Sequence, residues 1–510
     1  MKRGHDKLLA VKTPQEYSPL WGIHGIPACP EPRNGLACRT MLRTGLIQPE
    51  TIPGQFPRNL RAIVELYRTC LDRGAEIVIC PPLALGGMNT GELALRSGFR
   101  AQHQAALEYL AREIAEVPLL LGAPDAGGIR LYLLRLGRLL PQKAVIPGEC
   151  QEKNSAPAVG LFRGKESGEF TVRPVGEQNE RPSFKPCLLL RMPAAPWHEG
   201  QLEQDEEESR RLALETALPV ATVRLAGGEG PFMLPGASSL WSGTGELAAR
   251  LRLFERDAAV IPGEIPADET GPLPAPDWQT RHVLRKGTAD FILKTGCGSA
   301  CLNLLESAFS SLLAHVLKKS LPDLPVTGFI PRLSGTPEKD IARAEHLAAG
   351  LGIRPISLPP MSEVQPGSAE EGCLSACRIR ALADEEGALL LSSLNGTDIT
   401  TDLRAIRAAC TADFMPLKDL YESELAALFP EFATASPEAV LRDGLLMRLH
   451  REHVSATHLA ALMPDRELEI RRLQRLARTT EWDRRKLPPG LFLRSIPGTP
   501  EVPAIHQMAD

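Results

Sequence analysis

The stretch Lys294–Cys301, which reads KTGCGSAC, has the composition of a loop that could hold a phosphate group. It follows the apolar run DFIL and precedes the apolar-periodic segment LNLLESAFSSLLAHVL, so the pattern predicts a strand, a turn of small residues and a helix. The first amides of a helix have no partner inside the helix and favour anions. The stretch has no lysine after its glycines and no carboxylate. From these residues alone, the stretch is either a working phosphate loop or only the shell of one.

A second polar stretch, Ser392–Asp398 (SSLNGTD), follows the apolar run GALLL. In a doubly wound parallel sheet, ligands bind at the carboxyl ends of the strands. If both stretches follow strands, both lie at that edge. The sequence thus predicts one composite site there.

The elements that would position these residues alternate between helix and strand on both sides of a proline-rich segment. The 510 residues are too many for one ordinary core, and residues 261–277 hold five prolines and two glycines, as is typical of a linker. We expect one α/β domain over residues 1–260 and another over 278–510.

Helical and strand patterns support this division. In the first half, helices are predicted at 60–74, near 102–116 and near 206–216, between the strand runs EIVICPP, PLLLGAP, CLLL and PVATVRL. Residues 151–185 are polar and predict a surface excursion or a hairpin. In the second half, a helix over 337–352 lies between the strand runs VTGFIP and IRPISLPP, which favours a doubly wound parallel sheet.

Bulk properties exclude several classes of protein. A net charge of −4 gives no indication of nucleic-acid binding. Apolar runs are too short for a membrane span, and the N-terminus has no apolar core of signal-peptide length, so we expect a cytosolic protein with no membrane contact. Among eleven cysteines, the pairs Cys297/Cys301 and Cys373/Cys377 predict reduced thiols, with a metal or redox pair as the alternative.

The histidines of LHREHVSATH are His450, His453 and His458. Their spacing could suggest a metal site. They lie in an amphipathic segment, however, which favours a solvated helix face.

From about residue 50 to about 495, the chain resembles the glutamine-dependent NAD(+) synthetases. The segments that carry this resemblance are NLRAIVELYRTCLDRGAEIVICPPLALGG, FMLPGASSLWSGTGELAARLRLFE, VTGFIPRLSGTPEKDIARAEHLAAGLGI, ADFMPLKDLYESEL and TEWDRRKLPPG. The resemblance implies a nitrilase-like α/β sandwich that releases ammonia from glutamine. It also implies a doubly wound ATP-pyrophosphatase domain that adenylates deamido-NAD and passes the ammonia to it.

The resemblance implies a damaged amidase site. Such an amidase needs a cysteine nucleophile, a glutamate base and a lysine. The glutamate position falls on Pro82, and the nucleophile position falls on Arg191 or Pro193, depending on the anchor. Lys143 in KAVIP matches the lysine or is a surface lysine. Cys187, at the start of a strand, is expected to be a buried structural thiol.

The family's synthetase loop reads S-G-G-x-D-S, and its aspartate helps to hold magnesium. Here Ser299 takes the place of the aspartate and Ala300 that of the second serine. Arg378 and Arg380 match a family arginine segment in one alignment, whereas an ungapped alignment loses both. The positions that the resemblance implies for ATP are Thr295, Gly296, Cys297, Gly298, Ser299, Arg378, Asn395 and Thr397, and those for the substrate are Asp398, Asp413 and Asp419. Asp413 and Asp419 could instead be turn or helix-cap residues.

Three family lysines are also replaced, by Gly396, Glu422 and Asp483. Two of these changes put a carboxylate where a dinucleotide phosphate would lie. Each unit charge at about 4 Å interacts by roughly 1 kcal/mol in water, and by more where water is excluded.

These substitutions predict a degenerate synthetase without glutaminase activity and without synthesis, which binds a nucleotide or a partner. The alternative is a divergent synthetase that uses free ammonia. We expect weak ATP binding with doubtful use of magnesium. The expected partners are an adenine nucleotide or an active NAD synthetase paralogue, and we expect a homo-oligomer.

Overall fold

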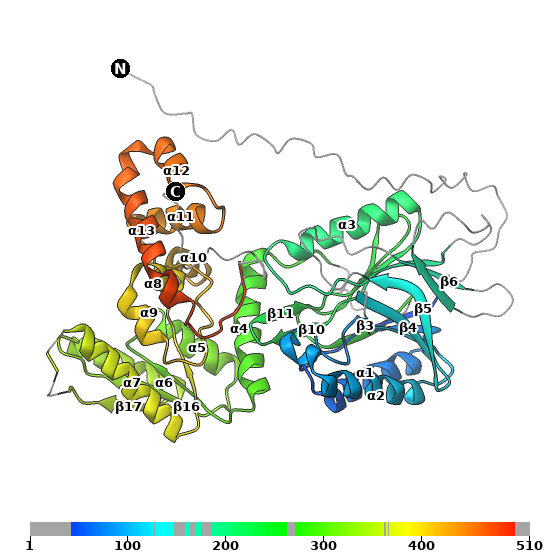
Figure 1. Cartoon of the computed structure of the whole chain (residues 1–510), viewed down its shortest axis with the longest axis horizontal. Helices are drawn as coiled ribbons and strands as arrows, with labels where there is room; N and C mark the ends of the chain where they lie inside the picture. Colours follow the sequence, from blue (N-terminus) through cyan, green and yellow to red (C-terminus); the bar gives the residue numbers. More distant parts are fainter. Residues whose placement is uncertain are drawn as a thin grey trace, which may run out of the picture.

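The computed structural model describes residues 42–125, 128–146, 159–163, 170–174, 186–262, 271–361, 364–365 and 367–494. Figure 1 shows two α/β halves with helix α4 (Pro276–Thr295) standing between them, and a group of helices from the end of the chain beside the second half. In the described residues, no helix is both long and apolar enough to span a membrane.

The first half is built on two facing six-stranded sheets. One has the strand order β14-β1-β2-β3-β4-β5, and the other has the order β13-β12-β9-β8-β6-β7. The strands of the first sheet are β14 (Asp257–Ile261), β1 (Thr44–Gln48), β2 (Ile77–Ile79), β3 (Leu119–Asp125), β4 (Gly128–Arg135) and β5 (Arg138–Ile146). The strands of the second are β13 (Leu247–Arg250), β12 (Ser239–Trp241), β9 (Val220–Thr222), β8 (Leu188–Arg191), β6 (Val159–Arg163) and β7 (Phe170–Pro174).

Helices cover the outer faces of both sheets. Helices α1 (Phe56–Asp72) and α2 (Ser97–Glu113) pack on the first sheet, and α3 (Gln201–Thr216) packs on the second. Buried side chains from both inner faces, such as Leu120 and Leu190, form the core between the sheets. The expected α/β sandwich is confirmed.

The predicted elements of the first half are confirmed within a few residues. Helices α1, α2 and α3 match the helical periods, and strands β2, β3, β8 and β9 match the apolar runs. The described part of 151–185 contains the antiparallel pair β6 and β7, which confirms the hairpin interpretation.

The second half has a four-stranded parallel sheet with the order β17-β16-β15-β18. Its strands are β15 (Ala300–Asn303), β16 (Val326–Pro331), β17 (Arg354–Leu358) and β18 (Leu389–Leu391). Helices α5 (Ser310–Ser320) and α6 (Glu338–Leu351) cover one face, and α7 (Ala369–Glu385) covers the other. The doubly wound parallel sheet is confirmed.

Six further helices of the described residues follow the sheet. They are α8 (Gly396–Thr401), α9 (Leu403–Ala409), α10 (Glu422–Leu428), α11 (Pro437–His450), α12 (Ala456–Leu462) and α13 (Glu467–Arg484). The region of the expected linker lies between β14, which ends at Ile261, and α4, which begins at Pro276.

The prediction for the start of the second half is wrong. The run DFIL is not a strand but part of the twenty-residue helix α4, which ends at the left-handed residue Gly296. Strand β15 follows, and helix α5 begins only at Ser310. The expected strand, turn and helix is therefore a helix, turn and strand. A short apolar run cannot be assigned to helix or strand by periodicity alone.

Candidate functional site

In the first half, Pro82 and Pro193 line the same small cavity. Pro82 follows β2, and Pro193 follows β8 on the facing sheet. The cavity measures about 10 Å³, which is room for about one water molecule. Its other lining residues are Met88, Ala194, Ala195, Arg224, Leu225 and Leu234.

Arg191 does not face this cavity. Its guanidinium donates to the backbone oxygen of Asp205 at 2.9 Å and to the hydroxyl of Ser209 at 2.7 Å, both on α3. Asp205 also pairs with Arg224 at 2.8 Å. Of the two candidates for the nucleophile position, Pro193 lines the cavity with Pro82 and Arg191 does not.

Lys143 and Cys187 are the other two residues considered for the amidase site. Lys143 lies in β5, and its side chain falls outside the described part of the chain. Cys187 lies just before β8, is only half-buried, and donates from its thiol to the Leu161 carbonyl at 3.2 Å. Its expected burial is therefore incomplete.

In the second half, the structure divides the predicted ATP residues between opposite edges of the sheet. Thr295 ends α4, and its hydroxyl donates to the Ile292 carbonyl at 2.7 Å. The carbonyl of Ser299 accepts from the amide of Leu389, the first residue of β18. Residues 295–299, which include Gly296, Cys297 and Gly298, thus lie at the amino edge. Three strand residues, or roughly 10 Å, separate them from the carboxyl edge.

Asn395, Thr397 and Asp398 lie at the carboxyl edge, after β18. Asn395 caps the start of α8, and its side chain accepts from the amides of Thr397 and Asp398 at 2.9 and 3.1 Å. Asp398 closes the capping box by accepting from the amide of Asn395. Burial raises the pKa of Asp398 to about 6, against the lowering effect of this hydrogen bond.

A buried acidic residue that the sequence analysis missed is Glu306, in the turn between β15 and α5. Its carboxylate accepts hydrogen bonds from both the amide and the hydroxyl of Ser393, the hydroxyl at 3.0 Å. The neighbouring Ser307 hydroxyl lies 2.9 Å from that of Ser393. Burial raises the pKa of Glu306 to about 7. The sequence does contain a signal for this residue. Glu306 and Ser307 directly follow the mostly apolar run ACLNLL, where a strand ends and before a helix begins.

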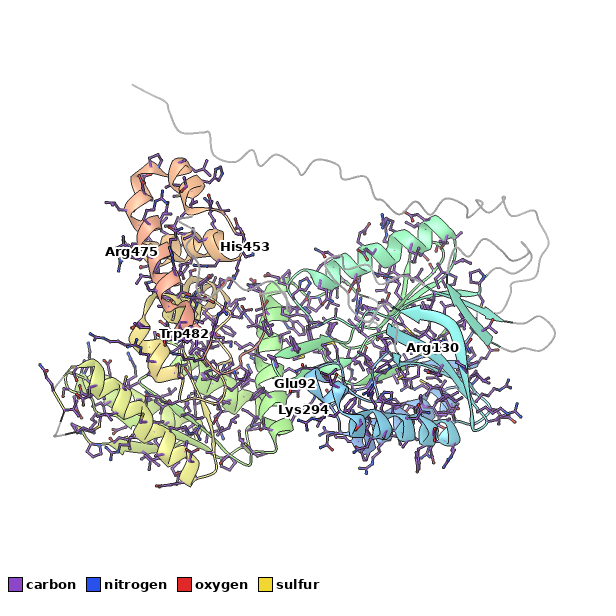
Figure 2. The ribbon with its side chains drawn as sticks, in the orientation of Figure 1. Glu92, Arg130, Lys294, His453, Arg475 and Trp482 are labelled. Carbon is purple, nitrogen blue, oxygen red and sulfur yellow. The ribbon has the colours of Figure 1, made fainter. Side chains whose placement is uncertain are left out.

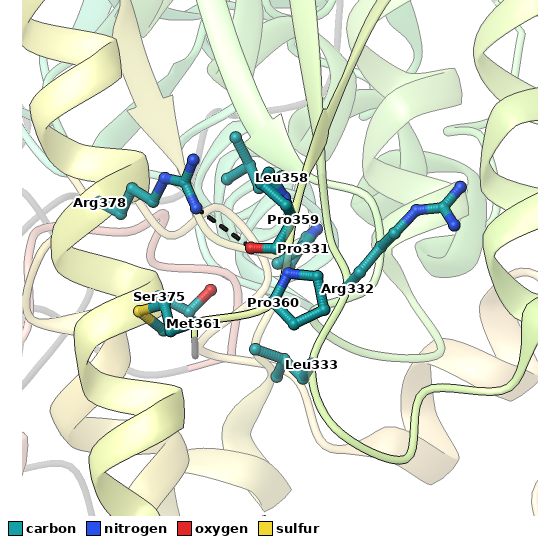
Figure 3. A pocket seen from close by; sticks show the side chains of 9 residues that line it. All are labelled: Pro331, Arg332, Leu333, Leu358, Pro359, Pro360, Met361, Ser375 and Arg378. Carbon is teal, nitrogen blue, oxygen red and sulfur yellow. Dashed lines mark hydrogen bonds between the residues drawn. The ribbon is translucent and has the colours of Figure 1, made fainter. Parts of the chain in front are cut away.

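The remaining predicted residues have structural partners. Arg378 on α7 donates to the Pro359 carbonyl at 3.1 Å, beside the small pocket drawn in Figure 3. Asp413 pairs with Arg380 at 2.7 Å and accepts from the amide of Leu390. The carboxylate of Asp419 accepts from two backbone amides, those of Leu493 and Arg494, each at 2.7 Å. For Asp413 and Asp419, these contacts match the alternative structural interpretation.

The two acidic replacements are paired within the protein. Glu422 forms an ion pair with Arg442 at 2.5 Å. Asp483 pairs with Lys486 at 2.8 Å, which lowers the pKa of Asp483. Their charge is therefore partly compensated before any ligand arrives.

The cysteine and histidine groups do not form a visible metal site. Cys297 lies in the turn before β15, which contains Cys301, whereas Cys373 and Cys377 share α7, and all four are free thiols. His453 and His458 are exposed, as expected, but His450 is half-buried and desolvation lowers its pKa to about 4. Within the described ranges, no three His, Cys, Asp or Glu side chains are placed to hold a metal ion.

Comparisons with known proteins agree with this architecture. The glutamine-dependent NAD(+) synthetase of Xylella fastidiosa strain Temecula1 is 24% identical over 88% of this chain and 95% of its own length, and that of Synechocystis is 23% identical over 88% and 96%. This chain is homologous to the glutamine-dependent NAD(+) synthetases. No family model matches it.

Solved NAD(+) synthetases share the fold over nearly the whole chain. The enzyme from Cytophaga hutchinsonii superposes with a TM-score of 0.69 at 14% identity, covering 89% of this chain and 95% of that one. The enzyme from Acinetobacter baumannii, solved with ADP, gives 0.63 at 16% identity and covers 89% and 96%. The glutamine-dependent NAD(+) synthetase architecture, with both halves, is therefore that of this chain.

Proposed function

We propose that the chain is a member of the NAD(+) synthetase family that binds an adenine nucleotide at the carboxyl edge of its second sheet and has lost both glutamine hydrolysis and NAD synthesis. The observation that carries this proposal is the meeting of Pro82 and Pro193 at one cavity. Neither proline has a nucleophile or a group that accepts a proton. A glutamine side chain also needs more room than about one water molecule.

Nucleotide binding is supported by the second half. The turn after β18 brings buried Ser392, Ser393, Asn395 and Thr397 to the carboxyl edge, where doubly wound sheets bind ligands. Hydroxyl and amide groups of this kind suit phosphate oxygens. The related enzyme from Acinetobacter baumannii was solved in complex with ADP.

Loss of synthesis is supported by the residues that stand where the related synthetases have lysines. Positive side chains would be needed to neutralise a departing pyrophosphate. At the three family lysine positions the chain has Gly396, Glu422 and Asp483. The ion pairs of Glu422 and Asp483 reduce their repulsion but add no positive charge.

The test has two arms. Calorimetric titration with ATP, with and without magnesium, should show weak binding that is nearly independent of magnesium. Incubation with deamido-NAD, ATP and either glutamine or ammonium should yield no NAD. NAD formation from ammonium alone would establish the alternative, a divergent ammonia-dependent synthetase.

The proposal extends to the setting of the protein. A binding role without catalysis would operate in the cytosol, as a homo-oligomer or with an active NAD synthetase paralogue. Cross-linking and co-purification with a paralogue from the same organism test the partners directly.

A further inference from the structure

Glu306 holds a position at the carboxyl edge that an anionic ligand would also use. It lies in the turn after β15, and its carboxylate crosses to the turn after β18, where it accepts from the amide and hydroxyl of Ser393. Ser393 is 1% exposed, so its amide is closed to water by these contacts. The Ser307 hydroxyl, at 2.9 Å from that of Ser393, completes the bridge between the two turns.

We propose that Glu306 is an internal competitor for the nucleotide: its carboxylate occupies the hydrogen-bond donors of Ser393, and a phosphate group gains them only when Glu306 is neutral or displaced. This inference rests on the proposed nucleotide binding at the same edge. It adds a specific residue that sets the affinity and its dependence on pH.

The physical reason is that two anions cannot share one set of donors at low cost. A carboxylate and a phosphate group held side by side repel each other, and they do so more strongly where water is excluded. Protonation removes the negative charge of Glu306 and converts one of its oxygens into a donor. The neutral side chain can therefore turn toward a phosphate oxygen instead of excluding it.

Burial of Glu306, together with a neighbouring carboxylate, makes its protonation accessible near neutral pH. Burial is the main cause of its raised pKa, and the Ser393 hydrogen bonds oppose it. The carboxylate of Asp398 on α8 raises the pKa further. Asp398 in turn faces Glu422, Asp402 and Arg442. Apart from Arg442, these neighbours are carboxylates, so the surroundings favour the neutral form of Glu306.

The sign of the pH effect follows. With a pKa of about 7, Glu306 is mostly neutral at pH 6 and mostly charged at pH 8. If only the neutral form admits the ligand, the affinity of the wild type falls about twofold at pH 7 and about tenfold at pH 8, relative to a variant that cannot ionise. The titration of ATP itself cancels in that ratio.

The experiment measures ATP binding calorimetrically without divalent cations, at pH 6, 7 and 8, for the wild type, Glu306→Gln and Glu306→Ala. We expect the Gln variant to match the wild type at pH 6 and to bind about tenfold more tightly at pH 8. The Ala variant, which leaves the Ser393 amide unoccupied, should bind more tightly than the wild type at every pH.

Glu229→Gln is the matched control, because Glu229 also accepts from two backbone amides, those of Met88 and Asn89, but lies in the first half. Its ATP affinity should equal that of the wild type at each pH. Weaker binding by Glu306→Gln would overturn the proposal, since Glu306 would then help to hold the ligand. Equal ATP affinity of all variants would overturn the proposed competition by Glu306 but not the proposed nucleotide binding. If no variant binds ATP although circular dichroism shows that each is folded, the proposed function itself is overturned.

Discussion

The carboxylate of Asp290 in α4 accepts a hydrogen bond of 2.7 Å from the amide of Gly228 in β10 (Ala226–Glu229), and thereby joins the two halves of the chain. Lys286, one helical turn earlier, pairs with Asp290 at 2.7 Å and with Glu50 of the first half at 3.0 Å. Lys294, one turn later and labelled in Figure 2, donates to the Gly228 carbonyl at 2.6 Å. One polar face of α4 thus holds the two halves together, and we call these contacts the junction.

Replacing Asp290 should destabilise the protein strongly. Asp290 is 4% exposed, and Asp290→Ala removes the partner of a part-buried lysine as well as the acceptor of the Gly228 amide. Breaking a buried pair typically costs about 3–5 kcal/mol. Urea unfolding should show this loss. Asp323→Ala, at an exposed carboxylate, should change the stability by less than about 0.5 kcal/mol. Equal effects of the two substitutions would contradict the junction.

A methyl group at Gly228 should be poorly tolerated. Its added Cβ would lie 2.9 Å from the Cβ of Asp290, closer than carbon atoms pack. Gly228→Ala should therefore lower the melting temperature. Gly298→Ala has no neighbour within 4 Å of the added Cβ and should be neutral or slightly stabilising. Both melts can be recorded by circular dichroism, and a more harmful Gly298→Ala would refute this placement.

The variant Ser299→Asp tests which edge of the second sheet binds ATP. From the alignment alone, this change should raise the magnesium dependence of ATP binding. From the structure, Ser299 lies at the amino edge, so ATP affinity should stay within about twofold of the wild type with or without magnesium. Ser393→Ala, at the carboxyl edge, should change the affinity. Titration calorimetry decides, and a magnesium-dependent gain in Ser299→Asp would restore the alignment-based site.

Purified protein should release no glutamate from glutamine. Pro82 and Pro193 offer no proton acceptor and no nucleophile, and loss of one triad member alone can lower turnover by about 10⁴- to 10⁶-fold. A coupled glutamate dehydrogenase assay measures the product. Turnover at roughly 1 per second or faster, within the usual range of enzymes, would be incompatible with this site.

The pH dependence of the protein's stability should reveal the raised pKa of Glu306. Its folded pKa of about 7 lies above its usual value of 4.5, so the folded state binds the proton more tightly. The resulting stabilisation is present below about pH 4.5 and is lost as the pH rises through about 7. The melting temperature of the wild type, relative to Glu306→Gln, should therefore fall between pH 5 and pH 8. A constant difference across that range would contradict the raised pKa.

Much of the fold could be predicted from the sequence because its helices and strands have regular patterns. The buried face of α1, for example, contains Ile63, Val64 and Tyr67 at helical spacing. The error around residue 291 arose because DFIL is short and apolar, and small residues follow it. The polar spacing of Lys286, Asp290 and Lys294, each four residues apart, indicates a helix and was the better signal.

The candidate site could be predicted only in part. Asn395, Thr397 and Asp398 directly follow β18, so their edge could be predicted. The contact between Glu306 and Ser393 joins residues 87 positions apart, and it depends on β15 and β18 being neighbours in the sheet. Strand order of this kind is not encoded in local periodicity. The same limitation applies to Pro82 and Pro193, which meet only because two separate sheets face each other.

The apolar packing of α4 bears on what can be deleted from this chain. Trp197 and Phe254 of the first half share one hydrophobic cluster with Val283 and Leu284 of α4, and the Trp197 indole donates to Gln279 at 3.2 Å. A shortened gene product that began at α4 would present this surface to water and invite aggregation. The first half therefore covers an apolar face of α4 whatever its own chemistry, and we expect a chain cut before α4 to lose solubility.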